Sequence, residues 1–128
     1  MNAILKFCGI LLLSVLLTGC EKNGVQNDLL IKIKNISNYD FQDVLVNTSG
    51  GEQQFGTIPA NTESGYRSFD SAYRYAYVEA VIDGKKYIIQ PIDYVGERLL
   101  YPGKYTYVIN ADANTGQYSR LQMHLQND

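Results

Sequence analysis

Apolar and polar residues alternate along most of the chain after residue 28. Leu29, Ile31 and Ile33 alternate with Leu30, Lys32 and Lys34, which is the pattern of a β-strand with one buried face. Comparable β-rich segments recur between clusters of turn-forming residues. The expected strands are 29–34, 41–48, 53–58, 64–69, 73–82, 85–90, 104–110 and 121–126.

Two local signals refine this pattern. Asp83-Gly84 separates two β-rich segments, and this dipeptide favours a type I′ hairpin because both of its residues tolerate positive φ. We therefore expect 73–82 to pair antiparallel with 85–90. Phe41 and Val44 fall on opposite parities of their segment, so either a bulge lies at Gln42-Asp43 or Phe41 caps an edge.

The number and length of the segments indicate the fold class. Eight short strands without a helical pattern of about ten residues predict an all-β, antiparallel sandwich of seven or eight strands. A small closed β-barrel is the alternative. Either fold leaves little interior volume at this size, so no cofactor is expected.

The first twenty residues differ from the rest. Lys6 precedes an apolar run, 7–17, of about 11 residues, which is too short for a membrane span and suits an export signal. Leu17-Thr18-Gly19-Cys20 resembles the lipobox of bacterial lipoproteins, which implies cleavage before Cys20 and a lipid on its thiol. The alternative is an ordinary export signal with a cysteine at the cleavage site.

The resemblance divides the chain into three parts and implies where the protein resides. Residues 1–19 are the expected lipoprotein signal peptide, 20–28 the lipidated cysteine with a flexible tether, and 29–128 the sandwich domain. The protein would then be held on a membrane of the cell envelope. Glu21, in place of the aspartate that favours inner-membrane retention, favours the outer membrane. Cys8 would leave with the signal, so the mature chain has no disulfide and no cysteine metal ligand.

Composition restricts the class of partner. A length of 128 residues fits one domain, and 45% hydrophobic residues fit a folded one. The formal net charge is -2, and no stretch has more than two adjacent Lys or Arg residues. A nucleic-acid partner is not expected, because such proteins gather basic residues on one face.

Two motifs within the domain resemble those of β-sandwich families. Residues 55–64, FGTIPANTES, look like the "G-x-I-x-P-G-x-S" turn of bacterial immunoglobulin-like and related adhesion modules, with Ala60-Asn61 in place of the usual Pro-Gly. Residues 101–106, YPGKYT, resemble the "L-x-P-G-x-Y-x-Y" segment of transthyretin-like and carboxypeptidase-regulatory-like sandwiches. The whole domain is similar to small lipoproteins of Bacteroidota. That similarity implies no activity and no site residues.

The residues capable of catalysis or metal binding form no convincing set. His124 lies on the polar parity of the last strand, where a solvent-facing position is expected. Residues 112–116 begin like a calcium loop but lack the later glutamate, which favours a plain turn. The pairs Asp40/Asp43 and Asp93/Glu97 are of a kind that any acidic β protein offers. We therefore expect no catalytic residue, no metal site and no enzyme.

Tyrosine is the unusual component, with 11 residues and no tryptophan. Tyrosine offers broad contact area and a hydroxyl for a protein or glycan partner. The alternative is that the rings serve β-propensity and the core. The expected binding face consists of three residues on one face of a strand and two from a neighbouring strand: Tyr73, Tyr75, Tyr77, Tyr105 and Tyr107.

One modification site comes from a three-residue resemblance. Asp70-Ser71-Ala72 resembles the O-glycosylation triplet of Bacteroidota, which implies a glycan on Ser71.

Three hypotheses for function remain. The first is a non-catalytic, membrane-anchored binding or structural module, with a small glycan-binding module as a variant. The second is an inhibitor of a hydrolase such as lysozyme, because Ser64-Gly65-Tyr66-Arg67 resembles the "S-G-x-R-Y" loop of membrane-bound lysozyme inhibitors; Ser68 replaces that tyrosine, and the family disulfide is missing. The third is a small hydrolase, which would need carboxylates converging in a cleft.

Overall fold

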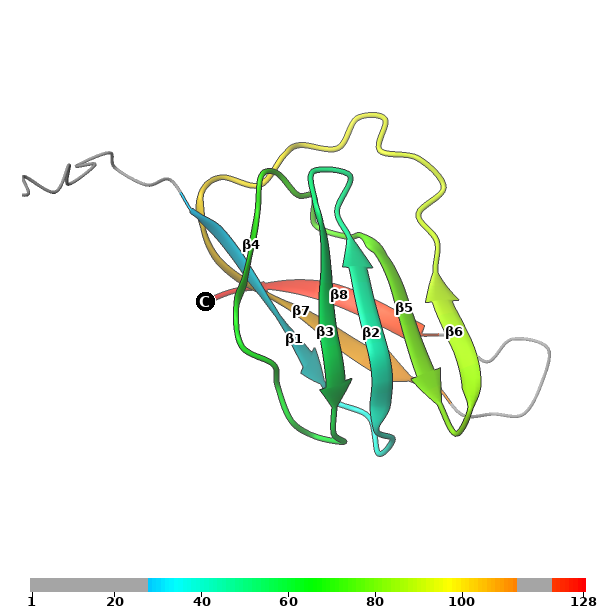
Figure 1. Cartoon of the computed structure of the whole chain (residues 1–128). Coiled ribbons are helices and arrows are strands. Elements are labelled where there is room, and N and C mark those ends of the chain that lie inside the picture. Colours follow the sequence, from blue (N-terminus) through cyan, green and yellow to red (C-terminus); the bar gives the residue numbers. More distant parts are fainter. Residues whose placement is uncertain (1–27, 113–120) are drawn as a thin grey trace, which may run out of the picture.

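Eight strands form two four-stranded sheets that face each other in the computed structural model, which describes residues 28–112 and 121–128 (Figure 1). One sheet has the order β4-β1-β7-β8. Its strands are β4 (Arg67–Phe69), β1 (Leu29–Asn35), β7 (Gly103–Ala111) and β8 (Leu121–Asn127). The other sheet has the order β3-β2-β5-β6. Its strands are β3 (Glu52–Ile58), β2 (Phe41–Asn47), β5 (Tyr77–Ile82) and β6 (Lys85–Ile89).

The core lies between the inner faces of the two sheets. Strand β5 shows the expected alternation, because Val78, Ala80 and Ile82 are buried while the residues between them are half-exposed. Ile31 and Ile33 of β1 supply the facing layer with 0% exposure. The predicted all-β sandwich is confirmed, and the barrel alternative is wrong because the described strands form two separate sheets.

One strand pair departs from the antiparallel prediction. β1 and β7 run parallel, with Leu29 opposite Gly103 and Asn35 opposite Ile109. Parallel neighbours need a crossover connection. Residues 90–102 provide the last part of it, because they carry the chain from β6 in one sheet to β7 in the other, beside the start of β1.

Both local signals have their expected outcomes. Asp83 and Gly84 have φ values of 49° and 76° and connect Ile82 to its partner Lys85, which confirms the two-residue hairpin. The register of β2 shifts between Phe41 and Val44, and Asp43 has a φ of 49°. This bulge turns both Phe41 and Val44 inward, where each is 0% exposed.

Two strands are shorter than the sequence predicts. The expected strand 64–69 is regular only over Arg67–Phe69, although Glu63 bridges to Lys34 further along β1. The expected strand 73–82 begins only at Tyr77. Residues 70–76 instead form a loop that is fastened by an isolated bridge between Ser71 and Gly50.

The end of the sandwich where β1 begins is built from several segments. The amide of Gly103 donates to the Asp28 carbonyl at 3.0 Å, and the amide of Leu100 donates to the Ala72 carbonyl at 2.8 Å. The start of β1, the loop 70–76 and the connection 90–102 therefore share this end, which we call the N-terminal end (Figure 1). The Asp83-Gly84 turn lies at the opposite end (Figure 1).

A fully buried amide organises that opposite end. Asn35 is 0% exposed. Its Nδ2 donates to the carbonyls of Tyr39 at 2.7 Å and Ile58 at 3.0 Å, while its Oδ1 accepts from the amide and hydroxyl of Ser37. Because one side chain satisfies groups from two turns, it holds the β1–β2 turn against the end of β3.

Candidate binding site

The connection 90–102 is fastened to the loop 70–76 at several points. The Tyr75 hydroxyl donates to the Asp93 carbonyl at 3.1 Å. The Arg74 guanidinium donates to Glu97 Oε1 at 2.8 Å. Together with the Leu100–Ala72 backbone hydrogen bond, these contacts hold a long connection of irregular structure in one position.

Three tyrosine rings stack where the two segments meet. The Tyr94 ring lies 4.4 Å from that of Tyr73 and 5.5 Å from that of Tyr75, with interplanar angles of 21° and 15°. Each such pair contributes about 0.5–1.5 kcal/mol beyond the area that it buries. The stack therefore adds an aromatic fastening to the polar contacts.

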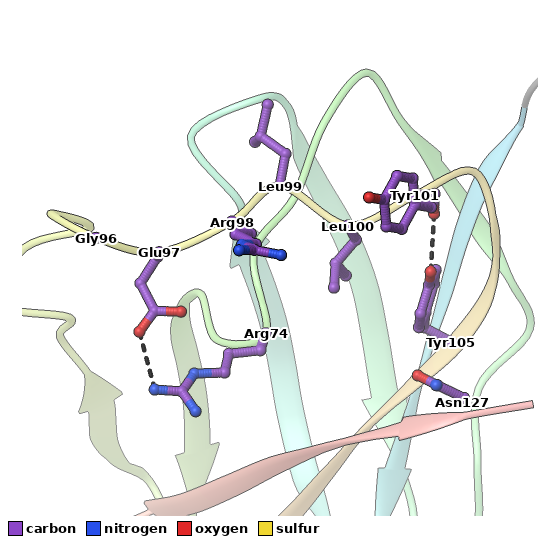
Figure 2. Close-up of a pocket in the computed structure, with 9 residues that line it drawn as sticks. All are labelled: Arg74, Gly96, Glu97, Arg98, Leu99, Leu100, Tyr101, Tyr105 and Asn127. Atoms are coloured by element: carbon purple, nitrogen blue, oxygen red, sulfur yellow. Dashed lines mark hydrogen bonds and ion pairs between the residues drawn. The ribbon is translucent and has the colours of Figure 1, made fainter.

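A hollow of 530 Å³ opens beneath the connection (Figure 2). Its walls come from the loop 70–76, the connection and the adjacent ends of β7 and β8, and its lining residues include Arg74, Glu97, Arg98, Tyr101, Tyr105 and Asn127. Figure 2 shows the Arg74 and Glu97 side chains pointing toward each other at one side of the hollow. Tyr101, which is 80% exposed, lies at the other side.

The groups around the hollow combine charge, hydrogen-bonding capacity and aromatic surface. The Tyr105 hydroxyl donates to the Tyr101 carbonyl at 2.8 Å, which fixes the backbone under the exposed Tyr101 ring. Partial burial, followed by the nearby Glu97 carboxylate, raises the pKa of Tyr75. The Tyr75 phenol therefore stays protonated and remains a donor to Asp93. Such a surface can hold a partner by stacking and hydrogen bonding.

The structure corrects the predicted tyrosine face. Tyr73 and Tyr75 do not project from one strand with Tyr77, because they belong to the loop that precedes β5. Tyr77 is the first residue of β5, and its hydroxyl donates to Glu79 Oε1 at 2.6 Å. Tyr105 and Tyr107 belong to the other sheet. The five residues therefore form no continuous face, although the loop brings Tyr73 and Tyr75 to one end of the molecule.

Tyr107 belongs to the core. Its side chain is 0% exposed, and its hydroxyl donates to the Tyr73 carbonyl at 2.6 Å. Burial raises the pKa of this phenol well above its usual range. The side chain therefore links β7 to the loop 70–76 from inside the sandwich and cannot contact a partner directly.

Ser71 lies at the bridge between the loop 70–76 and the β2–β3 turn. Its carbonyl accepts a hydrogen bond of 2.7 Å from the Thr48 hydroxyl, and its backbone pairs with Gly50. The residue is half-buried. Glycosylation of Ser71 stays a prediction.

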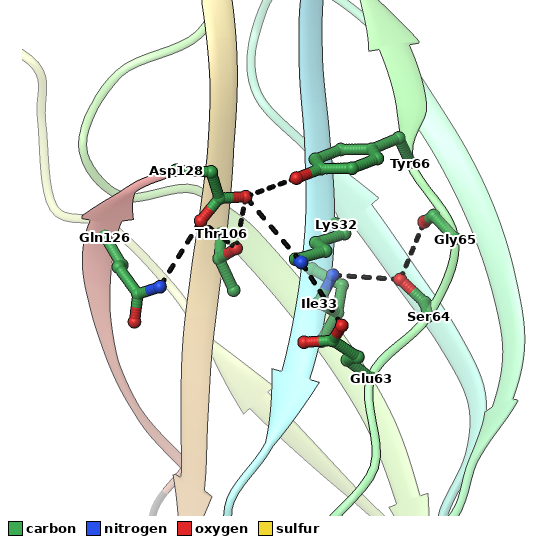
Figure 3. Close-up of polar contacts among 9 residues, drawn as sticks. All are labelled: Lys32, Ile33, Glu63, Ser64, Gly65, Tyr66, Thr106, Gln126 and Asp128. Carbon is green, nitrogen blue, oxygen red and sulfur yellow. Dashed lines mark hydrogen bonds and ion pairs between the residues drawn. The ribbon is translucent and has the colours of Figure 1, made fainter.

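The segment 64–67 packs against β1 (Figure 3). The Ser64 hydroxyl accepts from the Ile33 amide at 2.9 Å and donates to the Gly65 carbonyl at 2.8 Å. The Tyr66 hydroxyl donates to Asp128 at 2.6 Å. These side chains fasten the segment and the last residue to the sheet.

A polar network surrounds Asp128. Its carboxylate accepts from Tyr66 and Thr106 and lies 3.8 Å from Lys32 Nζ, which also contacts Glu63 at 3.2 Å (Figure 3). Desolvation alone would raise the pKa of Asp128. The hydrogen bonds from Tyr66 and Thr106 and the Lys32 charge outweigh it and lower that pKa below its ordinary value.

The candidate catalytic residues lie on different elements of the described part of the chain. His124 is exposed on β8, as expected. Asp40 accepts from the Ala60 amide, and Asp93 from the Val95 amide. Within residues 28–112 and 121–128, no three His, Cys, Asp or Glu residues gather as a metal site would require. Most of the predicted turn 112–116, and Cys20, lie outside the described residues.

Sequence reasoning missed Tyr94 and the Arg74–Glu97 pair. Tyr94 lies in a stretch without alternation, so periodicity gave no reason to place it beside Tyr73 and Tyr75. The only local signal is the turn around Gly96, which has a φ of 78°. The site depends on contacts between segments about 20 residues apart, and these follow from the crossover rather than from any motif.

The comparisons with known proteins support the fold alone. An NMR structure of a protein from Eubacterium rectale is similar, with a TM-score of 0.57 and 18% sequence identity over 80% of this chain and 92% of that one. No protein-family model and no curated protein matches the chain. Among the described residues, no helix is long and apolar enough to cross a membrane.

Proposed function

We propose that this chain is a lipid-anchored protein of the cell envelope whose sandwich domain binds a protein partner at the hollow beneath the 90–102 connection, without catalysing a reaction. The Cys20 lipobox supports the anchoring, and Glu21 favours the outer membrane. One observation carries the binding proposal. The connection is held by the Tyr73–Tyr94–Tyr75 stack and the Arg74–Glu97 pair, yet presents Tyr101 with 80% of its surface exposed.

A fixed surface loses little conformational entropy on binding. A connection held by several contacts need not be ordered by its partner, so more of the interaction energy appears as affinity. Exposed tyrosine and arginine side chains are enriched at binding sites, because each combines broad apolar area with hydrogen-bond donors. Arg98 and Tyr101 provide both on the lining of the hollow.

A glycan partner is the second candidate. The exposed Tyr101 ring lines the same hollow as the polar side chains of Arg98 and Asn127 (Figure 2). A hollow lined by an aromatic ring and hydrogen-bond donors is suited to a sugar, which presents both a C–H face and hydroxyl groups.

The binding proposal is tested by capture from envelope extract with a chain that begins at Glu21. The double variant Arg98→Ala/Tyr101→Ser is compared with a matched control, Arg67→Ala/Tyr66→Ser, after circular dichroism has shown that both fold. Capture should be lost only in the first variant. Capture lost only in the second would instead favour the inhibitor hypothesis on segment 64–67, with lysozyme inhibition as its direct assay.

Two further readouts separate the remaining alternatives. Protease treatment of the extract should abolish capture if the partner is a protein. Capture that survives protease treatment, together with binding to defined glycans, would support a glycan partner. Incorporation of labelled palmitate that is lost in Cys20→Ser tests the anchoring. A chain that incorporates no palmitate and leaves the membrane fraction would contradict the anchor.

A further inference from the structure

Large exposed hydrophobic side chains are concentrated on the connection. Among the described residues, six large hydrophobic side chains are exposed, and four of them lie within the ten residues 92–101. They are Ile92 (99% exposed), Val95 (87%), Leu99 (53%) and Tyr101 (80%). Single exposed apolar residues are ordinary, whereas a concentration of them indicates a surface that something covers.

The exposure of Val95 is built into the backbone. The Glu97 amide donates to the Tyr94 carbonyl at 3.0 Å, and Gly96 has a φ of 78°. A positive φ at the third position is typical of a type II turn, so Val95 occupies the tip of the turn. The Tyr94 ring is stacked on the domain while its neighbour Val95 is exposed. The Val95 side chain is therefore held away from the core.

The connection lies at the end of the domain that the tether joins. Asp28, which precedes β1, accepts the hydrogen bond from Gly103 where the connection ends. Eight residues, 21–28, separate Cys20 from β1. Such a chain spans at most about 26–29 Å when extended and about 14–17 Å as a flexible coil. A lipid on Cys20 would thus keep this end of the sandwich close to the bilayer surface.

We propose that the 90–102 connection is a second membrane contact, in which Ile92 and Val95 enter the boundary between headgroups and acyl chains of the bilayer that holds the Cys20 lipid. This inference rests on the proposed anchoring. Neither Ile92 nor Val95 lines the hollow, so partner binding and membrane contact use different side chains.

The tether favours a bilayer as the occupant of this surface. Attachment makes the contact intramolecular, so a few apolar side chains suffice although they would bind a free bilayer weakly. Interfacial binding grows with the apolar area that enters the boundary region. The contact would orient the domain with its N-terminal end toward the bilayer and the Asp83-Gly84 turn away from it.

The test uses the lipidated protein in vesicles of phosphatidylethanolamine and phosphatidylglycerol. After processing, Cys20 is the only cysteine and its thiol carries lipid, so a maleimide fluorophore reacts only at an introduced cysteine. The label is placed at Val95→Cys, with Lys85→Cys at the opposite end as the control. Quenching by spin-labelled lipid is measured at each position.

We expect quenching at position 95 to exceed that at position 85 several-fold, and to fall when Ile92→Ser is added. Equal quenching at 95 and 85 in a protein that still incorporates palmitate would overturn the membrane contact and leave the anchoring intact. A label at 95 that is shielded only by added envelope protein would also overturn it. Absence of palmitate on Cys20 would overturn the anchoring itself, and the membrane contact with it.

Discussion

The Tyr107 hydroxyl provides a measurable link between the core and the binding site. It donates to the Tyr73 carbonyl at 2.6 Å from a side chain that is 0% exposed. Tyr107→Phe keeps the ring and removes only this donor. A part-buried carbonyl that loses its partner costs about 1–2 kcal/mol, so we expect the free energy of unfolding to fall by about that amount. The melting temperature should fall by about 4–8 °C for each kcal/mol in a domain of this size.

Tyr105→Phe is the matched control, because Tyr105 lies two residues earlier on the same strand and also donates to a backbone carbonyl, that of Tyr101 at 2.8 Å. This bond is exposed, so water can replace the lost donor, and the loss should stay below about 0.5 kcal/mol. Both variants are made in a chain that starts at Glu21. Urea unfolding then gives the loss in free energy of unfolding for each variant. Similar losses in the two variants, or none for Tyr107→Phe, would refute the argument that burial decides the cost.

Two further predictions concern polar groups elsewhere. Asn35→Leu should lower the free energy of unfolding by about 2–3 kcal/mol in urea titrations, because it leaves the buried carbonyl of Ile58 and the part-buried carbonyl of Tyr39 without their donor. A loss below about 0.5 kcal/mol would contradict this prediction. Asp128→Asn should lower stability at pH 7 by about 0.5–1 kcal/mol, since the carboxylate contacts Lys32. Folding lowers the pKa of Asp128. The stability difference between the wild-type chain and Asp128→Asn should therefore be fully present above the ordinary aspartate pKa of 3.8. It should vanish as the pH falls through the lowered pKa of the folded state. Unfolding measured from pH 7 to pH 2 tests it, and a difference that persists at pH 2 would contradict it.

The strands and their buried faces could be predicted from the sequence, because both are local properties. A period of two follows from the backbone of an extended chain, so Val78, Ala80 and Ile82 identify an inward face before any partner is known. The Asp83-Gly84 hairpin is likewise a property of two adjacent residues. The bulge at Asp43 could be expected because Phe41 and Val44 must both be buried despite their opposite parities.

The arrangement of those strands and the composition of the site were decided by the tertiary structure. The parallel pairing of β1 with β7 results from a crossover, and a crossover has no periodic pattern in sequence. Tyrosine suits a core, a stack and an exposed surface equally well, so composition could not distinguish the buried Tyr107 from the stacked Tyr94 or the exposed Tyr101. The segments that the crossover brings next to each tyrosine determine whether it is buried, stacked or exposed. Burial and stacking depend on contacts between distant segments, so they are not properties of one residue.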